Sequence, residues 1–78
     1  MITEIGIVAG EIWNFLDTHG QVDLDELVRG LERPREWILM SLGWLAREGH
    51  VLVDCKDDAY SIRLREKQRK HEVKNNTF

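Results

Sequence analysis

The chain is poor in the residues that mark several classes of protein. It has one cysteine, Cys55, and one proline, Pro34, among 78 residues. A single cysteine cannot form an internal disulfide, which is typical of the reducing cytosol. The longest apolar stretches, at 5–10 and 37–40, fall far short of the roughly 20 residues that span a bilayer. No Lys or Arg precedes Arg29, so the basic start of a signal peptide is also missing. We expect a cytoplasmic protein with no membrane partner.

Sequence motifs for catalysis are also missing. The chain has no phosphate-binding loop, dinucleotide fingerprint, nucleophile elbow or paired-histidine metal motif. His50 and Cys55 are five residues apart on a predicted strand, so they face opposite sides and cannot share a metal. Asp57 and Asp58 are adjacent, which suits a turn better than an acid–base pair. We therefore expect no enzymatic activity, metal, cofactor or small-molecule ligand.

Charge is distributed unevenly along the chain. Residues 1–62 hold 5 Lys or Arg against 12 Asp or Glu, whereas residues 63–78 hold 6 against 2, and together these give the net charge of −3. An acidic body with a basic end can indicate a nucleic-acid or membrane partner.

The spacing of apolar residues predicts three helices, over 3–19, 23–31 and 34–48. Thr3 is the predicted N-cap of the first helix, and an Asp with a Glu three residues later gives the second a capping-box start. Pro34 is expected at the first position of the third helix.

The two glycines of the first helix and the segment between the first two helices each allow more than one interpretation. Gly6 and Gly10 each weaken the first helix by about 1 kcal/mol relative to Ala, and they could let another helix approach closely. Residues 21–22 could pair as a very short strand.

After Gly49 the apolar period changes from 3.6 to 2, which predicts a β-hairpin over 51–64 with a turn at 57–58. The fold class is therefore mainly α with a small β-hairpin, a winged helix-turn-helix of three helices plus a two-stranded wing over residues 1–64. Residues 65–78 are almost without strongly apolar side chains, so we expect a basic, disordered C-terminal tail.

Three segments resemble known winged-helix proteins. Residues 23–28 and 33–38 resemble the helix-turn-helix of winged-helix regulators, and 42–51 is similar to their Leu-x-x-Leu-x-x-x-Gly-x-Val exit into the wing. The Ile-Gly-x-x-Ala-Gly-x-Ile-Trp pattern at 5–13 resembles a small prokaryotic family of stand-alone winged helix-turn-helix domains of unknown function. The resemblance implies the fold but no chemistry.

The fold predicts a module of the DNA-binding, transcription-regulator type, with double-stranded DNA as one expected partner, because the third helix of winged-helix regulators lies in the major groove. Its predicted outward arc carries Glu36, Met40, Gly43 and Arg47, a set with few base-reading side chains. DNA binding is therefore predicted to be weak or non-specific. The candidate phosphate contacts are Arg33, Arg35, Arg47, Lys56, Arg65, Lys67, Arg69 and Lys70. The alternative is that the helical arginines are solvated or pair with Glu32, Glu36 and Glu48 of the same helical hairpin.

A protein partner or a homodimer is the rival expectation. Leu39, Met40 and Trp44 fall outside the narrow buried line of the third helix, and Trp and Met are common at binding hot spots and interfaces. These three residues are the candidate protein interface. The alternative is that the tryptophans fill the small core, which we expect for Trp37 and leave open for Trp44.

Overall fold

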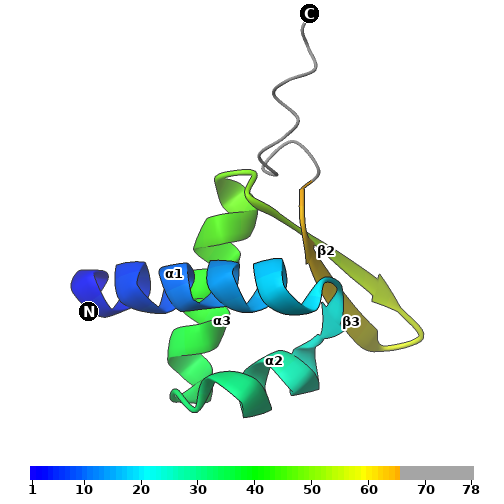
Figure 1. The fold of residues 1–78 in the computed structure, drawn as a ribbon, viewed down its shortest axis with the longest axis horizontal. Helices are drawn as coiled ribbons and strands as arrows, with labels where there is room; N and C mark the ends of the chain where they lie inside the picture. The colour runs from blue at the N-terminus through cyan, green and yellow to red at the C-terminus, as the bar shows by residue number, and fades with distance from the viewer. Residues whose placement is uncertain (66–78) are drawn as a thin grey trace, which may run out of the picture.

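The computed structural model describes residues 1–65, which form three helices and a small antiparallel sheet. Helix α1 lies across α3, α2 runs beside them, and the hairpin of β2 and β3 projects away from the helices (Figure 1). This arrangement confirms the predicted winged helix-turn-helix fold. The elements in chain order are α1 (Ile2–His19), β1 (Val22–Asp23), α2 (Leu24–Leu31), α3 (Arg35–Arg47), β2 (Val51–Lys56) and β3 (Ala59–Leu64).

The first two helices begin in different ways. Helix α1 starts at Ile2 with Met1 as its N-cap, so the prediction that Thr3 caps it is wrong. No side chain caps α1, and the amino group of Met1 lies 3.0 Å from a carboxylate oxygen of Glu4 in the first turn. The predicted capping box of α2 is confirmed. The Asp23 carboxylate accepts from the Glu26 N–H, and the Glu26 carboxylate accepts from the Asp23 N–H, both at 2.8 Å.

Helix α3 begins one residue later than predicted. Pro34 is the N-cap residue, with an extended backbone (φ −55°, ψ 136°), and its carbonyl accepts hydrogen bonds from the N–H groups of Trp37 and Ile38. The helix ends at Arg47, and Gly49 follows with a left-handed φ of 81°, as expected for a glycine that closes a helix.

The sheet has one strand more than the predicted wing. Its strand order is β1-β3-β2, and both pairings are antiparallel. Val22 of β1 lies opposite Ile62, so the short strand expected at 21–22 is present but shifted by one residue. Asp57 and Asp58 connect β2 to β3 with φ angles of 53° and 66°. Two successive left-handed residues match the right-handed twist of a hairpin, and Asp tolerates that conformation.

The core lies where α1 crosses α3 and where the base of the sheet meets the helices. Ser41 of α3 is fully buried beneath α1, and its hydroxyl donates to the carbonyl of Ile5 at 3.1 Å. Trp13 and Trp37 are partly buried and pack against the core. The buried apolar residues are Val8, Ala9, Ile12, Leu16, Val22, Leu27, Ile38, Leu42, Leu45, Val51, Ile62 and Leu64.

The glycines of α1 face open space. A Cβ atom built on Gly6 or Gly10 would meet no heavy atom within 4 Å. The expectation that these glycines admit another helix is therefore not met within residues 1–65. Their small size is not needed for the packing of α1 in this part of the chain.

We expect Gly10→Ala to raise the free energy of unfolding by up to about 1 kcal/mol, because alanine is the better helix former and its methyl group meets no neighbour. Urea denaturation followed by circular dichroism measures the change. Gly20→Ala is the matched control and should destabilise, because Gly20 has a φ of 76°. A loss of stability in Gly10→Ala would contradict the open environment of this position.

Candidate functional site

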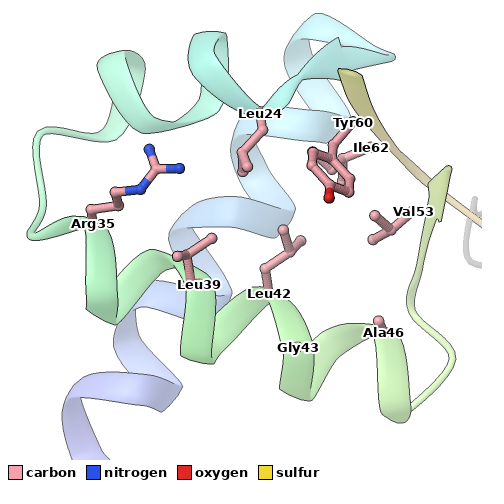
Figure 2. A pocket seen from close by; sticks show the side chains of 9 residues that line it. All are labelled: Leu24, Arg35, Leu39, Leu42, Gly43, Ala46, Val53, Tyr60 and Ile62. Carbon is pink, nitrogen blue, oxygen red and sulfur yellow. The ribbon is translucent and has the colours of Figure 1, made fainter. Parts of the chain in front are cut away.

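An open apolar hollow lies between α3, the start of α2 and the wing (Figure 2). Its volume is about 410 Å³. Side chains from both helices and both strands of the hairpin point into the same space. The lining residues are Leu24, Arg35, Leu39, Leu42, Gly43, Ala46, Val53, Tyr60 and Ile62.

The helical wall of the hollow follows from the residue spacing of α3. Ile38 and Leu45 are buried in the core, whereas Arg35, Leu39 and Ala46 lie on a neighbouring flank that faces the wing. Positions four and seven residues apart share one side of a helix, so this flank is continuous. Ala46 is small, which leaves the hollow open at the end of α3.

The wing wall of the hollow follows from strand alternation. Val53 and Tyr60 point toward α3 because alternate residues of β2 and β3 share one face of the sheet. Leu39, Val53 and Tyr60 nevertheless remain 40%, 41% and 46% exposed. Val53 and Tyr60 of the hairpin and Leu39 of α3 therefore present apolar surface that the fold of residues 1–65 does not cover.

One end of the hollow continues into an acidic depression of about 320 Å³. Asp23, Asp25 and Asp58 line this depression, and Arg35 is the cation beside them. Three carboxylates against one guanidinium make this end of the face negative. A phosphate backbone would meet repulsion here, whereas a cationic group would meet attraction.

Arg33 is occupied by an ion pair within the domain. Its Nε donates to Glu11 Oε1 at 2.8 Å, and its Nη2 donates to Glu11 Oε2. The hydrogen bonds from Arg33 hold the pKa of Glu11 below its ordinary value, and those to Glu11 raise the pKa of Arg33. The acid that engages Arg33 is not one of the three that the alternative to phosphate contact named. It comes from α1, 22 residues away.

The other candidate phosphate contacts are spread over the surface. Arg35 lies at the hollow, Arg47 is exposed at the end of α3, and Lys56 is exposed next to the wing turn. No ion pair engages these three side chains within residues 1–65. Arg65 is partly buried, with its guanidinium lying against Gly49. Lys67, Arg69 and Lys70 lie outside the described residues.

The three candidate interface residues are exposed as expected, at 40% for Leu39, 44% for Met40 and 48% for Trp44. They do not form one cluster. Leu39 and Trp44 are five residues apart, which places them about 140° apart around the helix. Leu39 lies in the hollow, whereas Trp44 lines a second apolar depression beside Ile2 and Ile5 of α1.

Several residues of the site were missed by sequence reasoning. Ala46 is inconspicuous in the sequence, and Val53 and Tyr60 belong to the alternating pattern of the predicted hairpin, which does not show that they face α3. The hairpin register could have identified them. It places Val53 and Tyr60 on the same face of the hairpin as Val51, Ile62 and Leu64, which are buried in the core.

Within residues 1–65, no helix is long and apolar enough to cross a membrane. The same residues hold no group of three or more His, Cys, Asp or Glu side chains placed to bind a metal ion.

Comparison with known proteins places the chain in a family. It belongs to the winged helix-turn-helix domain family DUF2582, whose model matches residues 1–64. This membership confirms the resemblance seen in the sequence. The chain is also similar to the solution NMR structure of protein BT2368 from Bacteroides thetaiotaomicron, with 26% identity and a TM-score of 0.74 over 88% of this chain and 84% of that one. The comparison with curated proteins gives no match.

The ion pair of Glu11 predicts a pH-dependent contribution to stability. The folded-state pKa of Glu11 is lowered, so the pair stabilises the fold at pH above the ordinary value of 4.5, and this contribution is lost as the pH falls through the folded-state pKa. We expect Glu11→Gln to lower the urea midpoint at pH 7, with a difference from the wild type that shrinks below pH 4.5. The effect is modest because both side chains are partly exposed. Glu48→Gln, at an exposed carboxylate, is the control, and an equal loss there would contradict a specific role for Glu11.

Leu39 is exposed, so we predict that its side chain contributes little to the stability of the core. We expect Leu39→Glu to change the free energy of unfolding by no more than about 0.5 kcal/mol, since surface substitutions rarely do more. Thermal unfolding measures this. Leu45→Glu is the control and should prevent folding, because Leu45 is 3% exposed and a buried unpaired charge is costly. A large loss in Leu39→Glu would make Leu39 a core residue.

Proposed function

We propose that this chain is a winged helix-turn-helix module that binds another protein through the face made by α3 and the wing. The apolar hollow on that face is the observation that carries the proposal. A cluster of exposed aliphatic and aromatic side chains around a concavity is the usual composition of the centre of a protein interface. The winged helix then acts as a scaffold that recognises a polypeptide.

The residues of α3 support protein binding over reading of DNA sequence. Base readout in the major groove uses Arg, Lys, Asn, Gln, Ser or Thr side chains on the outer surface of the helix. The exposed positions in the middle of α3 are instead Leu39, Met40 and Gly43, with Glu36 near the N-terminus of the helix. Apolar side chains cannot hydrogen-bond base edges, and a carboxylate at this end of the helix repels phosphate.

The wing supports the same proposal. A wing that binds DNA presents cations to the backbone, whereas this wing carries Asp57 and Asp58 at its turn beside Lys56. The neighbouring acidic depression extends the negative charge to the start of α2. A partner with a basic group next to apolar side chains fits the face better than a polyanion does.

Non-specific binding to duplex DNA is the second candidate function. Winged helix-turn-helix domains are commonly DNA-binding, and Arg35, Arg47 and Lys56 have no ion-pair partner within residues 1–65. Contacts of this kind give weak binding that falls steeply with salt. The logarithm of the binding constant falls against the logarithm of the salt concentration with a slope of about −0.9 for each phosphate neutralised.

Titration of fluorescently labelled duplexes of two unrelated sequences separates these functions. We expect no saturable binding at 150 mM salt with a Kd tighter than about 10 µM, and no discrimination between the sequences, because α3 lacks base-reading side chains. Binding that discriminates the sequences at 150 mM salt, and that Arg35→Ala/Arg47→Ala abolishes, would overturn the protein-binding proposal. Arg29→Ala, an exposed cation on α2, is the matched control. Weak binding confined to about 50 mM salt would support the non-specific candidate alone.

A further inference from the structure

The wing has a free edge beside the apolar hollow. In the strand order β1-β3-β2, β2 pairs with β3 on one side, and no strand of residues 1–65 pairs with its other side. The strand is six residues long, and all of them beyond Val51 are exposed. An exposed edge of this length can accept a further strand from another polypeptide.

The hairpin register determines which backbone groups lie on that edge. The Arg65 N–H donates to the His50 carbonyl at 3.1 Å, so His50 and Arg65 form a hydrogen-bonded pair. Such pairs alternate along an antiparallel ladder, which directs the groups of the even-numbered residues of β2 toward β3. The N–H and C=O groups of Val51, Val53 and Cys55 therefore point away from β3, along the free edge.

The side chains of the same three residues share the inner face of the sheet. Val51 is buried, and Val53 lines the hollow. Cys55 is exposed on the same side, two residues further along the strand. A strand added at this edge would place its own alternate side chains on the inner face, next to the hollow. The best-fitting strand therefore has small or apolar side chains at every second position, as β2 itself does.

We propose that the free edge of β2 pairs antiparallel with β2 of a second copy of this chain, centred on Val53. This inference rests on the proposed function, and it names the partner at the α3–wing face. The two sheets would join into one, related by a two-fold axis through the paired Val53 residues. Val51 of each copy would lie opposite Cys55 of the other copy. The outward N–H and C=O groups of these residues would form the hydrogen bonds between the two strands.

Charge favours this register over its neighbour. Antiparallel pairing sets outward-facing residues opposite outward-facing residues, so the two-fold axis must pass through a residue. An axis at Val53 or at Asp54 then gives the longest overlap, because either one uses five of the six residues of β2. The axis at Asp54 would set two like charges directly opposite each other, which destabilises a strand pair. The axis at Val53 sets Asp54 opposite the second copy's Leu52, and Lys56 opposite the second copy's His50. No like carboxylates face each other in the Val53 register.

Proline at position 53 is the sharpest test. A proline removes the outward N–H of Val53, which the single chain does not use, and prolines are tolerated on edge strands when the missing N–H faces solvent. We expect sedimentation equilibrium at up to about 0.5 mM to show a weak dimer, since a strand-edge interface is small. Val53→Pro should lower the association constant by about tenfold or more. Val53→Thr keeps both the N–H and the β-branched shape, so it should stay within about threefold of the wild type.

Cysteine cross-linking gives a second measurement that does not depend on the proline variant folding. Hydrogen-bonded pairs of antiparallel strands have Cα atoms about 5.5 Å apart, which is suitable for a disulfide. In a Cys55→Ser background, Val53→Cys should form a disulfide dimer under mild oxidation much faster than Asp54→Cys, whose counterpart is displaced along the strand.

Three results would overturn the dimer. They are a monomeric wild type at about 0.5 mM, a folded Val53→Pro variant that dimerises as well as the wild type, or equal cross-linking at 53 and 54. If the chain is monomeric and does not discriminate DNA sequences, the dimer is wrong but the proposed protein binding at the hollow stands, with a different partner. Sequence-specific DNA binding would overturn the proposed function whatever the oligomeric state.

Discussion

The crossing of α1 over α3 is the contact on which the rest of the structure depends. Ser41 lies at this crossing with no exposed surface, and its hydroxyl donates to the carbonyl of Ile5. A small side chain lets the two helices approach, and the hydrogen bond removes the cost of burying the hydroxyl. Ile12, Ile38 and Leu45 are buried in the same core. Once this crossing is fixed, the orientation of α3 about its own axis is fixed as well.

The orientation of α3 decides what the molecule presents to a partner. With the Ser41 side turned toward α1, the flank of Leu39, Gly43 and Ala46 lines the hollow that faces the wing. The same rotation places Trp44 beside the N-terminal part of α1 rather than beside Leu39. A domain this small has no spare layer to cover such flanks, because it buries a smaller share of its surface than a larger domain does. Its binding chemistry is therefore set by the side chains that the core leaves outside.

Much of the fold could be predicted because the decisive signals are local. The reciprocal bonds of Asp23 and Glu26, the closing glycine at position 49 and the change of period after it each involve only a few neighbouring residues. The errors at Thr3 and Pro34 are of one or two residues, because several polar or restricted residues can end a helix and local sequence does not choose among them.

The candidate site was harder to predict because it depends on contacts between distant segments. The pairing of Glu11 with Arg33 joins α1 to the connection before α3, and no local pattern points to it. Sequence periodicity identified Leu39 as exposed but could not show that Tyr60 and Val53 lie across from it. That fact requires the position of the wing relative to α3, which follows from the packing of the whole domain.

The two edges of the sheet differ in length, and this difference limits how far any assembly through the sheet can grow. At the edge opposite β2 lies β1, which has two residues and leads directly into α2. A strand so short offers too few hydrogen-bonding groups to template another chain. Once β2 is covered, the sheet has no second edge from which a ribbon could extend. Association through β2 therefore stops at a dimer. The long exposed edge of β2 gives no route to an open-ended polymer.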